Sequence, residues 1–372
     1  MIGIAMLGYG HHGWLLMKLL HFHPMLRGRA RIVGIFDPSR DVQDKLRAKG
    51  IKAFSTVDEA IGAANVHAIM ICSPPQFHAD QAVQALESGK HVFSEVPMAL
   101  KAEDIERIIA AEGKSGKKYQ YGENYIFYAE VLYASHLVQS GIIGTPVYAE
   151  AEYLHDVSYR WLVDGHGGPD APRKESWYSL FDPLAYAHAI GPAQVGLGGL
   201  DHPAPFIEVT SYANDLGGKD GVPICTPSHS FHVGLFKTPS GAIAKCACAY
   251  VIAREPTRMG IQVVGELGTY EAPAYGRKGR LFLANDHVIT ARHHRAGKAR
   301  SIGRWQLQKV KSPGIQKEVS AAARVIDDWL TAIENDKQPH LNARIGGNMC
   351  LAGIAASQAA RNHKIVNIQL FE

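Results

Sequence analysis

The beginning of the chain constrains the fold more than any other stretch. An apolar run, IGIAMLG, leads into Gly8-Tyr9-Gly10-His11-His12-Gly13, and the helical stretch WLLMKLLHF follows. In a G-x-G-x-x-G motif the first glycine permits a tight turn, the second lets a diphosphate approach the backbone, and the third lets the helix pack against the strand. The helix also points the positive end of its dipole at the phosphates. This order of strand, glycine loop and helix predicts a dinucleotide-binding βαβ unit.

The end of the second strand indicates which dinucleotide binds. The run ARIVGIFD ends in Asp37. A carboxylate at this place can accept hydrogen bonds from both ribose hydroxyls of NAD and repels the 2′-phosphate of NADP. Ser39 and Arg40 follow directly, and Arg40 could tolerate that phosphate. We therefore predict NAD as the cofactor, with NADP as the less favoured alternative and a βαβ unit without any ligand as the purely structural one.

Strands and helices alternate as far as residue 123. HAIMICSPP, HVFSEVP and KYQYGEN are typical of further strands, and helical stretches such as HADQAVQALESG, with Gly89 as its stop, separate them. Such alternation predicts a doubly wound parallel sheet, in which ligands bind outside the carboxyl ends of the strands. We expect residues 1–123 to form an NAD-binding Rossmann domain whose strands end at Gly8, Asp37, Ser73, Glu95 and Asn124.

The pattern changes from residue 124 onward. YAEVLYASHLVQSG is typical of one amphipathic helix, and GTPVYAEAEYLHD alternates like a strand with one exposed side. Several later strand-like segments are joined by Gly, Pro, Asn or Asp turns, without helices of matching length between them. Residues 124–372 are therefore predicted to form a second domain with a mainly antiparallel open sheet, closed by the two helices EVSAAARVIDDWLTAIEN and GGNMCLAGIAASQAARNH. The loop-rich region 157–185 is a candidate cover for a substrate.

Composition excludes several classes of function. A net charge of +4 without a dense basic run argues against nucleic acid as a partner. No apolar stretch approaches the roughly 20 residues that cross a bilayer, and the N-terminus is typical of a strand rather than of a signal peptide. Five scattered cysteines suit a reducing cytoplasm better than a disulfide framework. None of the 19 histidines has partners at metal-ligand spacing, so we predict no metal site.

Over nearly its whole length the chain resembles the Gfo/Idh/MocA family, which includes glucose–fructose oxidoreductase and inositol dehydrogenase. The resemblance is carried by MLGYGHHG, IFDPSR, SPPQFHADQAVQALESGKHVFSEVP, GIIGTPVYAEAEYLHD and SQAARNHKIVNI. It implies that Ser73, Pro74 and His78 line the path from adenosine to nicotinamide, with Glu95 near the nicotinamide ribose and Asn124 near the ring. It also implies that the open sheet pairs between subunits, as in a homodimer or homotetramer. The predicted cofactor residues are Gly8, Tyr9, Gly10, His11, His12, Gly13, Asp37, Ser39, Arg40, Ser73, Pro74, His78, Glu95, Pro97 and Asn124.

One position departs from the family pattern. Typical members carry Glu-Lys-Pro at the end of this strand, and the lysine assists proton removal from the hydroxyl that is oxidised. This chain has Glu95-Val96-Pro97 instead, and an isopropyl group can neither donate nor accept a proton. The catalytic candidates therefore lie in FDPLAYAHAIGPAQ, as Asp182, Tyr186 and His188. On a helix Asp182 and Tyr186 would share a face, whereas His188 would point elsewhere unless the turn is irregular.

The same segment and the Glu-Val-Pro triplet resemble a branch of NAD-dependent glycoside hydrolases within this family. In that chemistry NAD removes a hydride from a ring carbon, C3 in our interpretation, and the C2 proton becomes acidic. The anomeric substituent then leaves by elimination, water adds, and the hydride returns. We assign the hydroxyl proton to His188 and the C2 proton or the leaving group to Tyr186, with Asp182 orienting or assisting them.

Three functions remain open at this point. The first is a redox-neutral glycosidase, the second is an NAD(P)-dependent sugar or polyol dehydrogenase in which His188 replaces the lysine, and the third is a non-catalytic NAD-binding regulator. Val96 favours the first and third, whereas Tyr186 and His188 together favour the first two.

Other polar and aromatic side chains are candidates for contacting the sugar. Aromatic faces stack on sugar rings, and an arginine can bind an anionic group through two hydrogen bonds. The cationic residues Arg160, Arg173 and Lys174 suggest an anionic glycoside. The predicted substrate-binding residues are His155, Arg160, Trp161 and Trp177.

Overall fold

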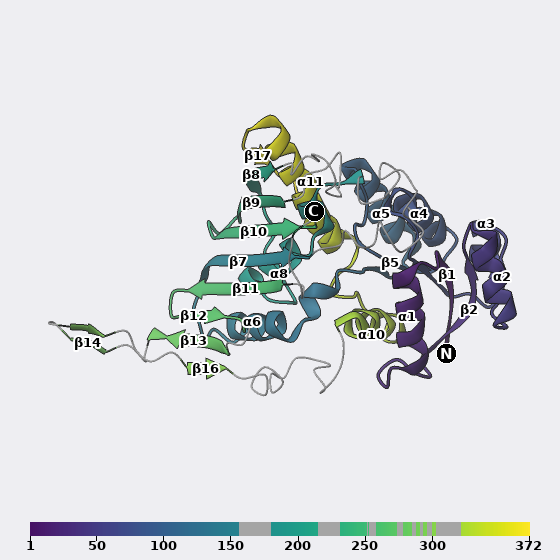
Figure 1. Cartoon of the computed structure of the whole chain (residues 1–372), viewed down its shortest axis with the longest axis horizontal. Helices are drawn as coiled ribbons and strands as arrows, with labels where there is room; N and C mark the ends of the chain where they lie inside the picture. Colours follow the sequence, from purple (N-terminus) through teal and green to yellow (C-terminus); the bar gives the residue numbers. More distant parts are fainter. Residues whose placement is uncertain are drawn as a thin grey trace.

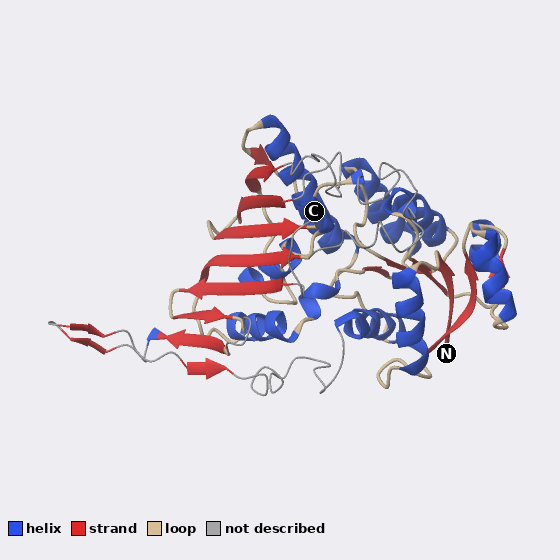
Figure 2. Ribbon diagram, in the orientation of Figure 1, coloured by secondary structure: helices blue, strands red, loops and turns tan. Residues whose placement is uncertain are grey.

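A computed structural model of the chain contains two large sheets, one on each side of the molecule in Figure 1. The parallel sheet comes from the N-terminal third, and the other sheet comes from the rest of the chain (Figure 2). The residues that the structure describes are 1–155, 180–214, 231–250, 252, 258–273, 278–284, 288–290, 293–295, 300–302 and 321–372.

The N-terminal sheet has six parallel strands in the order β3-β2-β1-β4-β5-β6. The chain extends the sheet from β1 to β3 on one side and then returns to add β4 to β6 on the other. Strand order therefore reverses between β1 and β4, where open parallel sheets bind ligands. The predicted doubly wound sheet is confirmed. Its strands are β1 (Ile2–Leu7), β2 (Ala30–Phe36), β3 (Ala53–Phe54), β4 (Ala68–Ile71), β5 (His91–Ser94) and β6 (Tyr119–Tyr121).

Local signals set the bounds of the helices between these strands. Ser39 and Thr56 accept hydrogen bonds from backbone N–H groups in the first turns of α2 and α3, as N-capping residues do. Gly116 ends α5 in the left-handed conformation, with φ of 64°. The helices are α1 (His11–Phe22), α2 (Arg40–Ala48), α3 (Val57–Gly62), α4 (His78–Glu87) and α5 (Ala102–Ser115), with the short 3₁₀ helices η1 (Pro75–Phe77) and η2 (Asn124–Phe127).

The second sheet has nine strands in the order β16-β13-β12-β11-β7-β10-β9-β8-β17. Among its described pairs only β7 and β10 run parallel, so the prediction of a mainly antiparallel sheet is confirmed. A separate pair, β14 (Val288–Thr290) and β15 (His293–Arg295), projects away from the body (Figure 1). The strands of the sheet are β7 (Pro146–Leu154), β8 (Glu208–Asn214), β9 (Phe231–Lys237), β10 (Ile243–Ala249), β11 (Arg258–Gly265), β12 (Gly268–Glu271), β13 (Gly279–Leu283), β16 (Arg300–Ile302) and β17 (Val366–Asn367).

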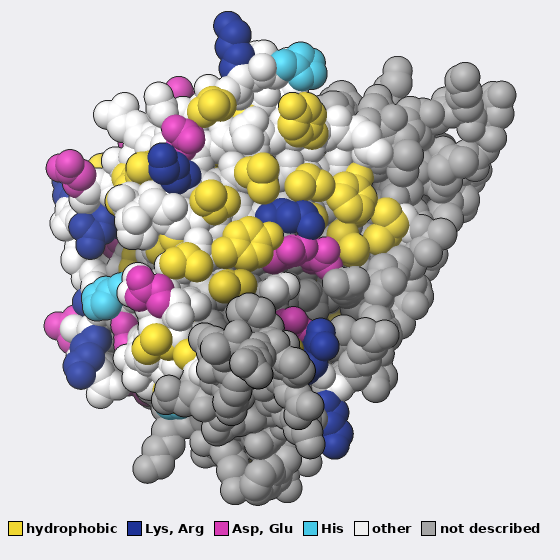
Figure 3. All heavy atoms as spheres, turned by 90° about the vertical axis from the view of Figure 1, so that its left-hand side faces the viewer, with side chains coloured by type: hydrophobic (Ala, Val, Ile, Leu, Met, Phe, Trp, Pro, Cys, Tyr) yellow, Lys and Arg dark blue, Asp and Glu magenta, His cyan; other side chains and the backbone are white. Residues whose placement is uncertain are grey.

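The helices that the structure describes cover one face of this second sheet. On α8 (Ile190–Gly198), Gly196 lies so close to the sheet that an added Cβ would be 2.9 Å from Val263 and 3.9 Å from Ala149. Helix α6 (Ala129–Gln139) packs beside α8, and α11 (Ala343–Asn362) packs on β8. Alternate residues point to the opposite face, where hydrophobic side chains gather around neighbouring basic and acidic ones (Figure 3).

Helix α10 (Ala321–Glu334) follows the second sheet in sequence but packs against the parallel sheet, beside α1 in Figure 1. The ring of Trp329 lies 5.6 Å from that of Phe93 on β5. Arg29 binds the carboxylates of Asp327 and Glu334, the latter at 2.7 Å. The N-terminal layer therefore includes a segment from near the end of the chain. No helix among the described residues is long and apolar enough to cross a membrane.

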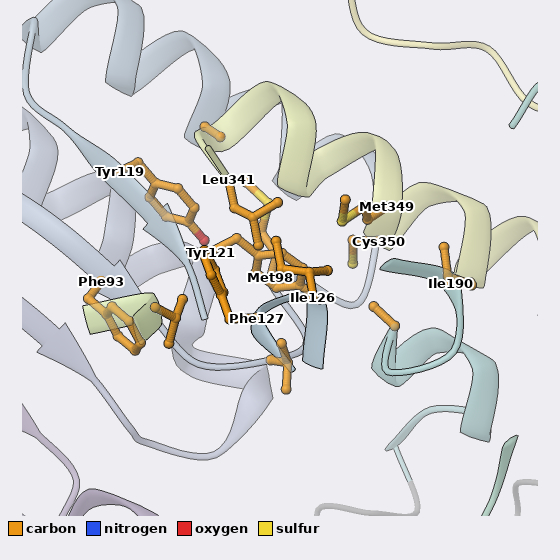
Figure 4. Close-up of a cluster of buried hydrophobic side chains, with 14 of the residues drawn as sticks. Phe93, Met98, Tyr119, Tyr121, Ile126, Phe127, Ile190, Leu341, Met349 and Cys350 are labelled. Atoms are coloured by element: carbon orange, nitrogen blue, oxygen red, sulfur yellow. The ribbon is translucent and has the colours of Figure 1, made fainter. Parts of the chain in front are cut away.

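An apolar cluster joins the two halves (Figure 4). Tyr119 and Tyr121 on β6 are fully buried and lie toward α11, which contributes Met349 and Cys350. Gly346 on α11 is needed here, because an added Cβ would lie 2.6 Å from the Cβ of Tyr121. The end of β6 is thus held at a fixed position relative to the second domain, which matters for the site described next.

Candidate active site

The glycine loop after β1 is built to admit a phosphate. Gly8 has φ of 94°, and an added Cβ would lie 2.6 Å from the carbonyl oxygen of Cys72. At Gly13 an added Cβ would lie 2.8 Å from the carbonyl oxygen of Gly8, so the helix can pack only if this residue is glycine. Gly10 precedes α1 and no side chain caps that helix. Its first N–H groups are thus available to an anion, and the residues fit the diphosphate of a dinucleotide.

Asp37 lies beside this loop at the end of β2. One carboxylate oxygen accepts a hydrogen bond from the N–H of Tyr9 at 2.9 Å, and the other accepts one from the N–H of Ser39 at 3.0 Å. Each oxygen keeps a further lone pair for a ribose hydroxyl. The Ser39 hydroxyl caps α2, and Arg40 is exposed at the start of that helix. This arrangement fits the unphosphorylated ribose of NAD.

His78 connects the ends of β4 and β5. One ring nitrogen, Nε2, lies 2.7 Å from the carbonyl oxygen of Ser73, and the other, Nδ1, lies 2.8 Å from that of Pro97. The residue is 1% exposed, and burial lowers its pKa although both carbonyl contacts favour the protonated ring. In this structure His78 therefore positions the backbone of the two strand ends, while Ser73 and Pro74 are only partly buried.

The Glu-Val-Pro triplet follows β5. Glu95 forms an ion pair with His12 of the glycine loop, with 3.2 Å between Oε1 and Nε2. Val96 is 4% exposed and belongs to the apolar core, and the backbone of the buried Pro97 is held by His78. The described end of β5 thus provides a carboxylate for the cofactor side but no group at position 96 that can move a proton.

A buried carboxylate–imidazole pair lies at the end of the neighbouring strand. Glu123 follows β6 and is fully buried, and its two oxygens lie 3.0 and 2.8 Å from Nδ1 of His188. The N–H of Tyr125 donates to the same carboxylate at 2.9 Å. An ionised carboxylate can only accept, so Nδ1 carries a proton, and in the neutral ring the lone pair is then on Nε2. Among the described residues Nε2 of His188 has no hydrogen-bond partner, so this nitrogen is available as a base.

Three tyrosines surround this imidazole. The ring centres of Tyr125, Tyr186 and Tyr153 lie 4.0, 4.3 and 4.8 Å from that of His188. The hydroxyl of Tyr153 is 2.6 Å from Nδ1 of His155, just beyond the end of β7. The site therefore combines an imidazole base with several phenols, which can exchange protons with a substrate hydroxyl and carbon acid.

The segment that carries Tyr186 and His188 is not the α-helix that the sequence analysis considers. Residues Pro183–Tyr186 form a 3₁₀ helix, η5, and Ala187 follows in the left-handed conformation with φ of 71°. In a 3₁₀ helix residues three apart align, so Asp182 and Tyr186 do not share a face. The turn at Ala187 instead directs Tyr186 and His188 toward each other, with 4.3 Å between their ring centres.

Asp182 is held on the other side of this segment. It is 1% exposed and accepts a hydrogen bond from Nη2 of Arg361 on α11 at 2.9 Å, and its carbonyl oxygen accepts one from the N–H of Ala185. Three predicted substrate residues, Arg160, Trp161 and Trp177, lie outside the described residues. His155 is described and lies at the site through Tyr153.

Three residues of this site, Glu123, Tyr125 and Tyr153, are not among those predicted from the sequence. Glu123 precedes Asn124, which was predicted from the same strand end, so its position there was the available signal. Tyr153 stands two residues before His155, which directly follows the strand, and continued alternation would place both side chains on one face. Tyr125 had no such signal, because it lies on the short helix η2 beyond the strand.

A comparison with known families agrees with this geometry. Residues 2–123 match the model of the Gfo/Idh/MocA oxidoreductase family, which describes an NAD-binding Rossmann fold. The match covers residues 2–123 alone, so the chain is similar to this family over its N-terminal domain. In the N-terminal domain of this chain, the glycine loop, Asp37 and the ends of β4 and β5 are the residues that would hold the NAD cofactor.

Curated relatives resemble only part of the chain. An α-N-acetylgalactosaminidase from Shewanella oneidensis is 29% identical over 135 residues, which are 36% of this chain and 29% of that protein. A glycosyl hydrolase family 109 protein from Shewanella baltica is 29% identical over 129 residues, 34% of this chain and 28% of that protein. The similarity therefore spans less than a third of each relative.

Solved structures resemble the whole chain in fold. A levoglucosan dehydrogenase in complex with NADH and levoglucosan has a TM-score of 0.79 at 18% identity, with 100% of both chains covered. An aldose-aldose oxidoreductase from Caulobacter crescentus has a TM-score of 0.73 at 20% identity, with 99% of both chains covered. At these identities the likeness is one of fold.

The close packing at Gly8 yields a prediction for the cofactor site. Gly8→Ala should weaken NAD binding by at least about tenfold, or roughly 1.4 kcal/mol, because the new methyl group would displace the backbone at Cys72 and Ser73. Gly28→Ala is the matched control: Gly28 has φ of 86° but nothing within 4 Å of an added Cβ. Calorimetric titration with NAD, together with thermal unfolding, measures both variants. Equal NAD affinities in the two variants would contradict the assignment.

Proposed function

We propose that the protein is an NAD-dependent glycosidase that cleaves a sugar glycoside without net oxidation. The observation that carries this proposal is the buried Glu123–His188 pair beside a strand end where Val96 replaces the family lysine. Bound NAD supplies reversible hydride acceptance at a ring carbon, C3 in this proposal. The residues of the chain must then move two protons, one from the C3 hydroxyl and one from C2, and must assist the leaving group.

His188 takes the proton of the C3 hydroxyl. Glu123 keeps the other imidazole proton on Nδ1, so that Nε2 presents its lone pair to the substrate. The same carboxylate stabilises the imidazolium that forms when the ring takes up this proton. His188 later returns the proton to the hydroxyl when the ketone is reduced again.

A phenol removes the C2 proton or protonates the leaving group. We assign this role to Tyr186, whose ring lies 4.3 Å from that of His188. Tyr153 is the second candidate, because the imidazole of His155, 2.6 Å from its hydroxyl, can take up or supply the phenolic proton. Burial raises the pKa of Tyr125, which disfavours the phenolate that this residue would need in order to act as a base.

Asp182 acts as a positioning residue in this proposal. Its contacts with Arg361 and with the N–H of Ala185 hold the start of η5, the helix that presents Tyr186. It lies on the side of α11, so it orients the phenol through the backbone. Its partnership with Arg361 argues against a direct proton transfer.

The comparisons support this function in part and also support a second one. The glycosidase names belong to relatives that are 29% identical over about a third of this chain, so the sugar and its anomer do not transfer. The neighbour in complex with levoglucosan is named as a dehydrogenase, and an ordinary sugar or polyol dehydrogenase that uses His188 as its base is the second candidate. A non-catalytic NAD-binding regulator is the third, and a built acid/base site argues against it.

A single labelling experiment separates these functions. The protein is incubated with NAD and an aryl glycoside in deuterated water. A glycosidase of the proposed type releases the phenol without a net rise in NADH absorbance and leaves deuterium at C2 of the sugar, because the C2 proton exchanges during elimination. Build-up of NADH with an intact glycosidic bond would establish the dehydrogenase instead. Neither signal, across a panel of glycosides, would leave only the regulator.

The Glu123–His188 pair makes a second prediction. Glu123→Gln should lower kcat by about 10²- to 10⁴-fold, because the amide would donate to Nδ1 and shift the imidazole proton to Nε2, where the base is needed. Tyr186→Phe and Tyr153→Phe, measured by exchange at C2, show which phenol acts there. Glu150→Gln, on the open sheet face, is the control and should keep full activity. Unchanged kcat in Glu123→Gln, with normal NAD binding, would remove His188 from the mechanism.

We also propose that the chain forms a homodimer, or a tetramer built from it, through the open face of the second sheet. Strand pairing places Tyr212, Leu235 and Ile243 on that face, and they are 76%, 48% and 48% exposed. Exposed apolar side chains in one patch favour association. Leu235→Glu should yield a single-chain mass by light scattering, whereas Ile142→Glu, an exposed residue away from the face, should not. A single-chain mass for the wild type would refute the proposal.

Two further features of the proposed function are the location of the protein and the charge of its substrate. We propose a cytoplasmic location, supported by the free thiols of the described cysteines, Cys72, Cys246, Cys248 and Cys350; cell fractionation tests it. An anionic substrate rests on Arg160, Arg173 and Lys174, which lie outside the described residues. Comparing the turnover of matched neutral and carboxylated aryl glycosides tests that part.

A further inference from the structure

The contact between the glycine loop and the end of β5 has no role in the chemistry proposed above. His12 lies in the first turn of α1, and its Nε2 is 3.2 Å from Oε1 of Glu95. The two side chains are 39% and 14% exposed, so the imidazole can reach solvent or a ligand while the carboxylate stays largely covered. This pair spans the two strand ends, β1 and β5, that flank β4 in the sheet.

The imidazole of His12 is notable because the glycine loop carries no lysine or arginine. The loop from Gly8 to Gly13 contains no lysine or arginine, so the two negative charges of a dinucleotide diphosphate meet no permanent cation on it. The N-terminus of α1 supplies only a partial positive charge, roughly half an elementary charge. Tyr9, His11 and His12 are the titratable groups of the loop. Burial raises the pKa of the Tyr9 phenol, so it stays neutral around neutral pH. Of the two histidines, His12 is the one with an ion pair to a carboxylate in the structure.

We propose that His12 is the titratable counter-ion of the NAD diphosphate and that Glu95 holds it in place. NAD affinity is then highest at low pH and falls as the pH rises and His12 loses its proton. By linkage, NAD binding above that midpoint takes up a proton. The proposal rests on NAD binding by the N-terminal domain and is independent of the glycosidase activity.

The other ionisable groups around the pair, within the described part of the chain, do not supply this dependence. The negative charge of Glu95 acts on both the Cys72 thiol and the His78 ring. Burial raises the pKa of the Cys72 thiol, and two carbonyl oxygens hold the His78 ring in place. Asp37 serves the loop from the far side through the N–H of Tyr9. Among the described groups around the pair, His12 alone combines exposure, an anionic partner and a position on the phosphate-binding loop.

The test is calorimetric titration of NAD into the protein at pH 6.0, 7.0 and 8.5, without substrate. For the wild type we expect affinity to fall by about tenfold over this range, equivalent to a shift of one pKa unit on binding. His12→Gln should bind more weakly at low pH and show a flat profile. Glu95→Gln should move the profile to lower pH. His21→Gln, at the other end of α1, is the matched control and should keep the wild-type profile.

Two further measurements identify the group that takes up the proton and the part of NAD that it binds. Titrations in buffers of different ionisation enthalpy should show proton uptake with NAD and with ADP-ribose, and none with adenosine, which lacks the diphosphate. Proton uptake should vanish in His12→Gln. A wild-type pH profile in His12→Gln, or equal uptake with adenosine, would overturn the proposal. Failure of the wild type to bind NAD at any pH would overturn both this proposal and the cofactor assignment, whereas the absence of glycosidase activity would affect neither.

Discussion

The hydrogen bond between Glu123 and His188 connects the two halves of the protein at the place where chemistry is proposed. The residues lie 65 positions apart in sequence and both are buried. A buried carboxylate without a partner is costly, and removing one member of such a pair leaves the other uncompensated. The orientation of the second domain against β6 is therefore tied to the pair. The apolar cluster in Figure 4 surrounds the same strand and keeps its end in place.

Val96 and Glu123 are linked by this geometry. Both follow strands of the parallel sheet, β5 and β6, which are neighbours about 4.8 Å apart. The family pattern has its ammonium at the end of β5, and this chain has a buried aliphatic side chain there. In the proposed mechanism the ionisable group lies at the end of the neighbouring strand, as the Glu123 carboxylate that acts through the His188 imidazole. Proton transfer at the site thus depends on the junction between domains as well as on the sheet.

The sequence predicts features that depend on neighbouring residues and misses those that depend on distant ones. The glycine loop, Asp37 and the alternation of strands and helices are local patterns, and the structure contains them. The hydrogen-bond partner of His188 is 65 residues away in sequence, and no pattern near either residue predicts the contact. Helix α10 is amphipathic, but its pattern does not state which sheet it covers, and Trp329 packs on β5. The turn at Ala187 was unpredictable for another reason, since a left-handed conformation is expected of glycine rather than alanine.

Imidazoles occupy three places around the cofactor site where a protein could have used permanent cations. His12 faces Glu95, His188 faces Glu123, and His78 lies between two carbonyl oxygens. A lysine or arginine at these places would keep its charge at every working pH, whereas an imidazole changes charge near neutrality and its state is set by the acceptor beside it. Glu123 orients the imidazole of His188, and Glu95 holds the imidazole of His12. Two carboxylates thus prepare the same type of side chain for different roles. In the two proposals, the imidazole of His188 presents a lone pair to the substrate, and the imidazole of His12 faces the diphosphate of the cofactor.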